Sequence, residues 1–305
     1  MPAEQTWTVA AALDWTVGYL TERGDEHPRL SAEWLLSAAT GLSRVELYAY
    51  FDRPLSPEER AALREGVRRR ATGEPLQYVT GEVAFRHLDL KVRPGVLIPR
   101  PETEVLIDAV LPAIDAAVAG RGSAIALDLC TGSGCVALAL AQERSDVRVV
   151  ATDLSPVAVA VAAENAERLG LAERVDACEG DLTAAVPDEL LGRGDLVGSN
   201  PPYVPSAEVP SLPAEVAGFE PHLALDGGAD GLDMFRRILG EARRWLRPGE
   251  GTLAVELDER RVQQAAAEAL QWYQDVRVVR DLAGRDRIVT ARKREVDPDD
   301  PSGQG

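Results

Sequence analysis

The sequence contains few cysteines and histidines, which limits the chemistry it can support. Its three cysteines, Cys130, Cys135 and Cys178, have neither an even count nor zinc-ligand spacing. This excludes a disulfide framework and gives no structural zinc site. We interpret the cysteines as reduced residues that pack in the interior. The three histidines are scattered along the chain, so no catalytic triad or metal site can be assembled from them. We therefore predict no metal.

Long apolar runs are also lacking, and basic residues are fewer than acidic ones. No run of 18 apolar residues is present, so we expect no contact with a membrane. The start, Met1-Pro2-Ala3-Glu4, has no basic stretch leading into an apolar one; we expect no signal peptide and a cytoplasmic protein. Only 33 Lys and Arg oppose 50 Asp and Glu, for a formal net charge of -17. An acidic chain repels a polyanion, so direct nucleic-acid binding is not expected.

What the chain does contain is enough apolar material for two cores. Apolar residues make up 45% of 305 residues, which suits one large and one small domain. We predict a helical domain at 1–72, a linker with a β-hairpin at 73–97 and a catalytic domain at 98–292. The acidic, proline-containing segment 293–305 is expected to be disordered. Two capping boxes mark helix starts in the first domain: Ser43 with Glu46, and Ser56 with Glu59.

A glycine-rich turn follows the first clear strand of the large domain. The buried-strand pattern 124–129 leads into Cys130-Thr131-Gly132-Ser133-Gly134 and then into a helical stretch at 135–142. This order predicts the first βα unit of a doubly wound sheet, where glycines let a ligand approach the backbone. The turn lacks the third glycine of a dinucleotide fingerprint and the glycine-lysine pair of a phosphate loop. A phosphate-free nucleoside therefore fits it better.

Acidic residues end the neighbouring strands. Asp153 ends the strand 148–152, about 20 residues beyond the glycine turn, the spacing at which a carboxylate reaches ribose hydroxyls. S-adenosylmethionine is a phosphate-free nucleoside whose sulfonium and ammonium charges suit a site lined by Asp128 and Asp153. After a third strand, Asp181 is placed to accept from the adenine amino group while Leu182 packs on the ring.

The run Asn200-Pro201-Pro202-Tyr203 ends a further buried strand, 195–199. Neither proline can donate to a sheet ladder, so the strand stops at Asn200, and the residue before a proline is held extended. The Asn200 carboxamide oxygen and the Pro201 carbonyl would offer two acceptors to a planar –NH2 group, and Tyr203 would cover its flat face. We predict Asn200, Pro201, Pro202 and Tyr203 as the catalytic residues.

Strands beginning near residues 124, 148, 175 and 195 are expected to be successive parallel strands of one sheet. Ligands bind outside the carboxyl ends of such strands at the switch point, so the glycine turn and Asn200 should share a crevice. The fold class we predict is α/β: a doubly wound, seven-stranded Rossmann-like methyltransferase sheet with a small N-terminal helical domain.

With these residues placed, the chain resembles the protein N5-glutamine methyltransferases that modify peptide chain release factors, from roughly residue 28 to residue 291. The resemblance is carried also by segments 73–81, 97–104 and 219–232, and by Arg287. It implies that Asn200 to Tyr203 hold a substrate glutamine and that the helical domain recognises the protein substrate. The expected cofactor-binding residues are Asp128, Cys130, Thr131, Gly132, Ser133, Gly134, Asp153, Asp181, Leu182 and Asn200.

Three positions depart from the family pattern. Cys130 stands where a glycine is common, and Leu182 stands where an aromatic residue is often found. Leu257-Asp258-Glu259 replaces a more usual turn of small residues. None of these changes touches the Asn200 to Tyr203 clamp. The first two bear on the adenine contacts and leave the expected reaction as it was.

The activity expected from the resemblance is methyl transfer from S-adenosylmethionine to the amide nitrogen, N5, of the glutamine in the Gly-Gly-Gln motif of release factors. We also expect the protein to be a monomer. Adenine also carries a planar –NH2 group, so an N6-adenine methyltransferase acting on DNA or RNA is an alternative. The net charge of -17 argues against it. A second alternative is a glutamine methyltransferase that acts on a ribosomal protein. A nucleoside-binding regulatory module is disfavoured by the intact clamp.

Overall fold

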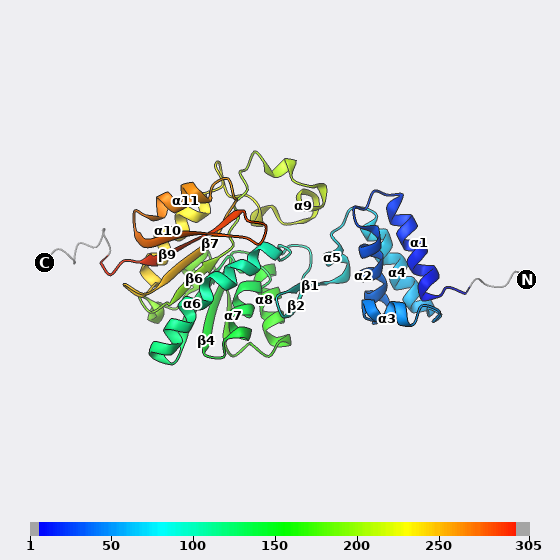
Figure 1. The fold of residues 1–305 in the computed structure, drawn as a ribbon, viewed down its shortest axis with the longest axis horizontal. Helices are drawn as coiled ribbons and strands as arrows, with labels where there is room; N and C mark the ends of the chain where they lie inside the picture. The colour runs from blue at the N-terminus through cyan, green and yellow to red at the C-terminus, as the bar shows by residue number, and fades with distance from the viewer. Residues whose placement is uncertain (1–5, 297–305) are drawn as a thin grey trace, which may run out of the picture. The chain divides into compact units, whose positions relative to one another are not determined.

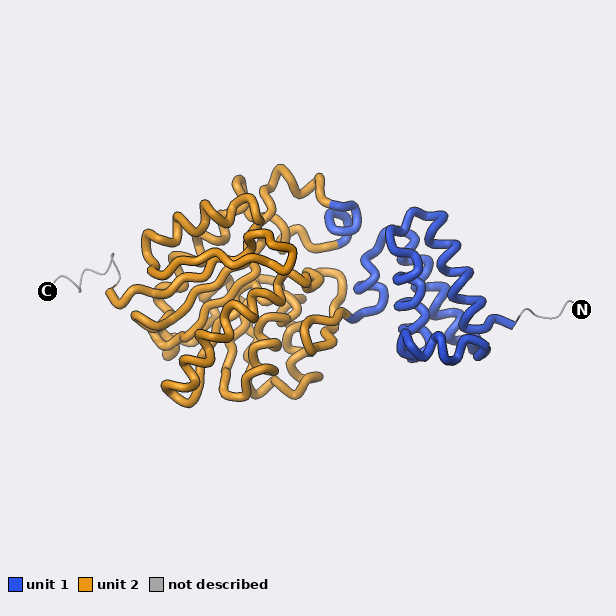
Figure 2. The backbone as a smooth tube through the Cα atoms, viewed as in Figure 1, with its two compact units in different colours: residues 1–82, 213–219 blue, residues 83–212, 220–305 orange. Residues whose placement is uncertain are grey.

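The computed structural model describes residues 6–296, which form two compact units (Figure 1). Among the described residues, the helical unit comprises 6–82 and 213–219, and the sheet unit comprises 83–212 and 220–296, coloured blue and orange in Figure 2. The helical unit therefore extends past residue 72, where the sequence places the end of the helical domain. It also takes in a short segment from the middle of the catalytic region.

The helical unit packs five consecutive short helices around one apolar core. Both predicted capping boxes are present, because Ser43 and Ser56 each accept from the backbone N–H of a glutamate three residues on, and that glutamate bonds back. Arg70 joins distant parts of the unit through ion pairs to Asp25 at 2.7 Å and to Glu215 at 3.0 Å. The helices are α1 Val9–Thr21, α2 Pro28–Thr40, α3 Arg44–Ala49, α4 Pro57–Arg70, α5 Leu76–Thr80 and α9 Ala214–Phe219.

The sheet unit is built on the predicted seven-stranded sheet. Its strand order is β5-β4-β3-β6-β7-β9-β8. The first five strands in this order are parallel, whereas β9 pairs antiparallel with both β7 and β8. The α/β, Rossmann-like fold class is thereby confirmed. The strands are β3 Ala124–Leu129, β4 Val147–Asp153, β5 Val175–Glu179, β6 Leu196–Ser199, β7 Thr252–Glu256, β8 Tyr273–Arg280 and β9 Asp286–Lys293.

Helices cover both faces of the sheet (Figure 1). Successive side chains of a strand point to opposite faces, so Ala126 joins one apolar cluster and Leu127 the other. The cluster that includes Ala126 also holds residues of α6, α7 and α8, and the cluster that includes Leu127 holds residues of α10 and α11. The helices are α6 Glu104–Arg121, α7 Cys135–Glu143, α8 Pro156–Arg168, α10 Asp233–Trp245 and α11 Val262–Ala269.

A two-stranded hairpin, β1 Glu82–Phe85 with β2 Leu88–Lys91, lies where the sequence predicts one. Buried Asn165 on α8 connects it to the glycine turn. The Asn165 carbonyl accepts from the Lys91 N–H at 2.7 Å, and its amide donates to the carbonyls of Lys91 and Ser133, both at 3.0 Å. The short 3₁₀ helices are η1 Pro101–Thr103, η2 Leu182–Ala185, η3 Asp188–Leu190, η4 Val209–Ser211 and η5 His222–Ala224.

The carboxyl-terminal boundary differs from the sequence-based one. Strand β9 includes Lys293, the first residue of the expected tail, and its N–H donates to the Gly251 carbonyl at 2.8 Å. Residues 297–305 of that tail lie outside the described residues. Within residues 6–296, no helix is long and apolar enough to cross a membrane.

We expect Asn165→Ala to lower the free energy of unfolding by about 2–4 kcal/mol. The substitution removes three hydrogen bonds, one buried and two partly buried, and a buried polar group left without its partner costs about 1–3 kcal/mol. Urea denaturation measures the change. The control is Glu164→Ala on the same helix, where a half-exposed ion pair to Arg93 is worth about 0–1 kcal/mol. Equal losses in the two variants would contradict the structural role of Asn165.

Candidate active site

The strand order changes direction between β3 and β6. The chain proceeds from β3 to β4 and β5 on one side, and from β6 to β7 on the other. Leu129 pairs with Ser199 at the carboxyl ends of these two strands, so the glycine turn and Asn200 begin side by side. Such a switch point is where doubly wound sheets bind ligands.

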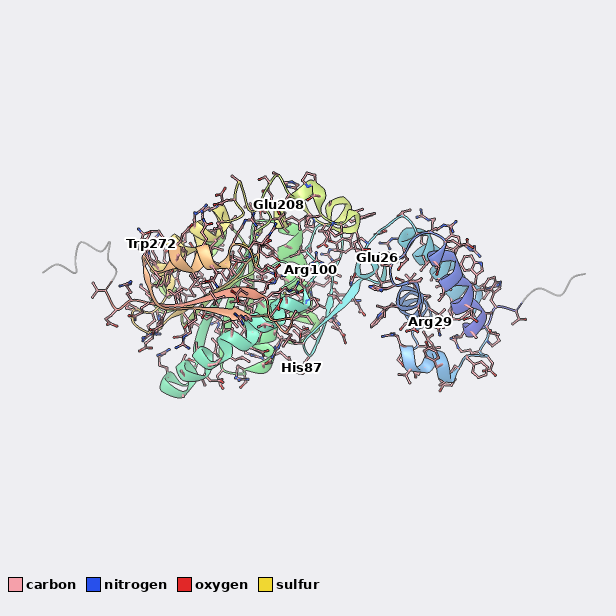
Figure 3. The ribbon with its side chains drawn as sticks, turned by 45° about the horizontal axis from the view of Figure 1, so that its top comes forward. Glu26, Arg29, His87, Arg100, Glu208 and Trp272 are labelled. Carbon is pink, nitrogen blue, oxygen red and sulfur yellow. The ribbon has the colours of Figure 1, made fainter. Side chains whose placement is uncertain are left out.

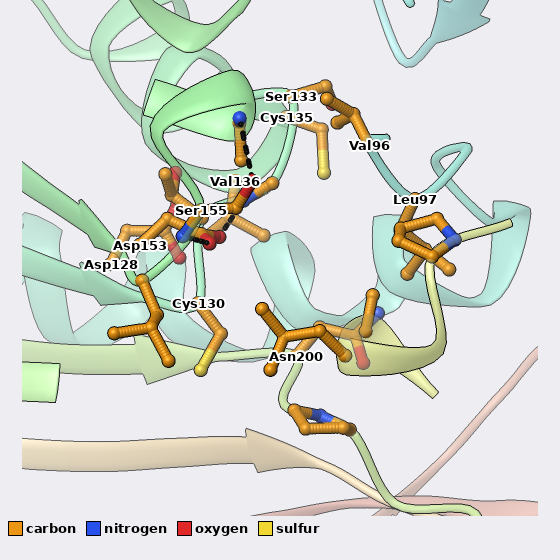
Figure 4. A pocket seen from close by; sticks show the side chains of 18 of the residues that line it. Val96, Leu97, Asp128, Cys130, Ser133, Cys135, Val136, Asp153, Ser155 and Asn200 are labelled. Carbon is orange, nitrogen blue, oxygen red and sulfur yellow. Dashed lines mark hydrogen bonds between the residues drawn. The ribbon is translucent and has the colours of Figure 1, made fainter. Parts of the chain in front are cut away.

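A cavity of about 1040 Å³, including solvent at its mouth, opens at this point (Figure 4). Its lining of apolar side chains with a few polar groups is typical of a small-molecule site. Predicted site residues that line it are Asp128, Cys130, Thr131, Gly132, Ser133, Asp153, Asp181, Leu182, Asn200 and Pro202. Predicted residues outside the lining are Gly134, Pro201 and Tyr203. Its apolar wall includes Val96, Leu97, Leu154, Ala158, Leu223 and Met234, none of which the sequence singled out as site residues.

The two glycines of the turn serve different purposes. Both adopt positive φ, +57° at Gly132 and +83° at Gly134. A Cβ on Gly134 would lie 3.0 Å from a Leu138 methyl carbon and 3.2 Å from the Ala162 Cβ, so this glycine allows α7 and α8 to pack closely. A Cβ on Gly132 would meet nothing within 4 Å, which leaves this backbone open toward the cavity.

The carboxylates of Asp128 and Asp153 hold the glycine turn in place through hydrogen bonds. Asp128, at 1% exposure, accepts from the Thr131 hydroxyl at 2.6 Å and from the Ala137 N–H at 3.1 Å. Asp153 accepts from the N–H groups of Gly132 and Ser155, both at 2.9 Å. Burial raises the pKa of Asp128 to about 7 and also raises the pKa of Asp153. A cationic ligand in the cavity would favour the ionised forms of both groups.

The two cavity positions that depart from the family pattern share an unusual backbone. Cys130 has φ of +59° and Leu182 has φ of +50°, a region that costs non-glycine residues about 1–2 kcal/mol. This conformation explains why glycine suits position 130. Burial raises the pKa of the Cys130 thiol to about 12, so it stays protonated at neutral pH and acts as a packing group.

Asn200 has a fixed orientation at the end of β6. Its amide nitrogen donates to the Thr103 hydroxyl oxygen at 2.9 Å. The Asn200 carboxamide oxygen is then the atom left for a ligand. The following residues are held by backbone bonds, from the Val204 N–H to the Leu225 carbonyl at 2.9 Å and from the Gly227 N–H to the Val204 carbonyl at 2.8 Å.

Two segments that carry the family resemblance, distant in sequence, meet beside the cavity. Buried Glu220 accepts from the Ile98 N–H at 3.2 Å and pairs with Arg100 at 2.5 Å; Arg100 is labelled in Figure 3. This interaction holds the two segments together beside the cavity. Asp181, in contrast, already pairs with Arg237 at 2.9 Å, so its carboxylate is shared between that guanidinium and the cavity.

Comparison with known proteins shows the family to which this chain belongs. Residues 11–81 match the PrmC N-terminal domain, and residues 104–212 match the methyltransferase small domain. A release factor glutamine methyltransferase of Geobacter sulfurreducens is 50% identical and covers 83% of this chain and 85% of its own. One from Moorella thermoacetica is 45% identical over 94% of this chain and 99% of its own.

Among solved structures, the catalytic domain of hMettl16 bound to a MAT2A 3′UTR hairpin superposes with a TM-score of 0.53 at 16% identity. It covers 77% of this chain and 83% of its own, and the likeness shows the fold alone. The sheet and the matched catalytic domain define a Rossmann-like methyltransferase whose cofactor is S-adenosylmethionine. Within that class, the chain belongs to the family of release factor glutamine methyltransferases.

We expect Gly227→Ala to reduce turnover at least tenfold and to lower stability. The new Cβ would lie 2.7–2.9 Å from backbone atoms of Pro202 and Tyr203, which cannot move without displacing the loop after Asn200. A displacement of about 1 Å can cost 100-fold in rate. Gly240→Ala on α10 is the control, because its Cβ meets nothing within 4 Å. Wild-type turnover by Gly227→Ala would contradict the close packing.

Proposed function

We propose that this protein transfers a methyl group from S-adenosylmethionine to the side-chain amide nitrogen, N5, of the glutamine in the Gly-Gly-Gln motif of a peptide chain release factor. The observation that carries the proposal is the orientation of Asn200. Because its nitrogen bonds to Thr103, its oxygen is free to accept from a planar –NH2 group beside the glycine turn. Family membership supports a glutamine amide as that group.

The residues around the cavity fit the cofactor. Ser133, at 2% exposure, has a hydroxyl oxygen with no hydrogen-bond partner among the described residues. Asp153 uses one lone pair on each oxygen for the backbone, and a carboxylate has about four, so acceptors remain for ribose hydroxyls. Val96, Ala158 and Leu182 offer apolar surface for a base. When bound, S-adenosylmethionine supplies an electrophilic methyl group.

In this proposal the protein contributes alignment. Asn200 Oδ1 and the Pro201 carbonyl accept the two N–H bonds of the substrate amide, which directs the nitrogen at the methyl group. Tyr203 rests against the amide plane. An amide nitrogen becomes acidic as it gains the methyl group, so its proton can pass to water. Burial holds the pKa of Tyr203 above its ordinary value, which keeps its phenol neutral.

We propose the helical unit as the part that recognises the protein substrate. It carries large apolar side chains that are exposed in the described structure. Remote contacts of this kind supply orientation at the reacting centre. We place the enzyme in the cytoplasm, where release factors act, and propose that it works as a monomer. The exposed apolar residues of this unit include Trp15, Trp34, Tyr48, Tyr50 and Phe51.

The test offers labelled S-adenosylmethionine with, separately, an intact release factor, ribosomes and duplex DNA. We expect the methyl group on the Gly-Gly-Gln glutamine, located by mass spectrometry, and at least a 100-fold loss with Asn200→Ala because the amide is no longer aligned. A release factor with this glutamine replaced by alanine is the substrate control. Faster methylation of adenine or of a ribosomal protein would overturn the proposal.

Cofactor affinity should weaken as the pH falls from 8 to 6. The ionised form of Asp128, with a pKa of about 7, attracts a cationic ligand, and protonation removes up to about tenfold in affinity. Asp128→Asn should reduce this dependence, whereas Asp188→Asn on the surface should retain it. Calorimetric titration with S-adenosylmethionine measures it, and S-adenosylhomocysteine, which lacks the sulfonium charge, should respond less. A pH-independent wild-type affinity would contradict the role of the ionised Asp128 carboxylate in cofactor binding.

A further inference from the structure

Two buried polar residues, Thr103 and Glu256, lie close to Asn200. Thr103, the last residue of η1, is fully buried and accepts from the Asn200 amide at 2.9 Å. Glu256, the last residue of β7, is 1% exposed. Strand β7 is the direct neighbour of β6, and Val255 pairs with Ser199, so Glu256 and Asn200 leave the two strands at the same level.

Glu256 is unusual in its surroundings. The Thr103 hydroxyl faces the Glu256 carboxyl closely enough to lower its pKa, which opposes the larger effect of burial, and the oxygen Oε2 has no hydrogen-bond partner among the described residues. Burying a carboxylate without full compensation is unfavourable, and purely structural sites avoid it. An acidic group at this position therefore has a functional reason.

Hydrogen-bond direction supplies that reason. An ionised carboxylate only accepts, so a hydroxyl that faces it must turn its proton toward it. The Thr103 oxygen then presents only lone pairs to Asn200. The Asn200 amide must therefore donate from its –NH2 group to the Thr103 oxygen, which leaves the Asn200 oxygen directed to the substrate. If Thr103 donated to Asn200 instead, the amide would turn over and present two N–H donors to the donors of the substrate.

We propose that Glu256 and Thr103 are positioning residues that fix the direction of the Asn200 carboxamide for methyl transfer. Neither side chain needs to touch the substrate, because each acts through the next. The inference rests on the proposed function of Asn200 as the acceptor of the substrate amide. It adds the residues that decide which atom of Asn200 does the accepting.

The groups around Glu256 set the pH range in which this arrangement works. Burial raises the pKa of Glu256 to about 7; Thr103, Arg287 and Arg100 oppose the rise, and Glu102 adds to it. Tyr203 also faces this cluster and stays neutral. Below about pH 7 the protonated Glu256 can donate to Thr103, and the direction of the Asn200 amide is no longer fixed. Turnover with saturating cofactor should therefore fall as the pH drops through this range.

The first experiment measures single-turnover methylation of an intact release factor at pH 8, together with cofactor affinity by calorimetry. Thr103→Val keeps the shape of the side chain and removes the hydroxyl. We expect a loss of about 10- to 100-fold in rate, with cofactor affinity unchanged within about twofold. Thr103→Ser, which keeps the hydroxyl, should return to within about threefold of wild type. Thr16→Val, at an equally buried threonine in the helical unit, is the control for the replacement itself.

The second experiment asks whether Thr103 acts through Asn200. Asn200→Asp has two equivalent oxygens, so it has no direction to be fixed. Thr103→Val should therefore change the rate by less than about threefold when it is added to Asn200→Asp. An equal loss in both backgrounds would show a general structural role and overturn the inference.

The third experiment replaces the charge. Glu256→Gln can donate as well as accept, so its rate at pH 8 should be about tenfold lower than that of wild type. Because the variant lacks the titrating carboxyl group, its turnover should not show the decline that wild-type turnover shows below pH 7. A wild-type rate and pH profile in this variant would overturn the role of Glu256. If the wild-type enzyme itself methylates no release factor, the proposed function fails. If the wild type is active but Thr103→Val matches it, only the present inference fails.

Discussion

The parallel pairing of β3 with β6 is the constraint on which the site depends. These strands are separated in the chain by α7, β4, α8 and β5, yet Leu129 and Ser199 are direct neighbours in the sheet. The pairing brings the glycine turn and Asn200 to one edge, so a methyl donor and an amide acceptor can be held in a single cavity. Apolar residues packed on both sheet faces fix this register, because a slip by one residue would move every side chain of the strand to the opposite face of the sheet.

Around that pairing, buried polar groups are used to hold backbone and side chains in place. Asp128 and Asp153 accept from the N–H groups and hydroxyl of the glycine turn, and Asn165 ties the same turn to the hairpin. Thr103 holds Asn200 in the same way. Each of these groups is costly to bury alone, so the network favours one arrangement of the cavity before any ligand enters. The positive φ values at Cys130 and Leu182 show strain stored in the same region.

Much of the architecture could be predicted from the sequence, because its signals are local. The capping boxes at Ser43 and Ser56 formed as expected, and the strand patterns before the glycine turn and before Asn200 became adjacent parallel strands. Most residues expected to bind the cofactor line one cavity. The extent of the helical unit was not foreseen. Segment 213–219 belongs to it through contacts such as Glu215 with Arg70, which join positions far apart in the chain.

The sequence by itself determined the fold class, the glycine turn, the acidic strand ends and the strand that stops at Asn200, because periodicity, glycine and proline act over a few residues. Tertiary structure alone decided which way the Asn200 amide points. Its partner Thr103 lies 97 residues earlier, and Glu256 comes from a neighbouring strand. Hydrogen-bond direction depends on which groups are buried together, and no local pattern in the chain carries that information.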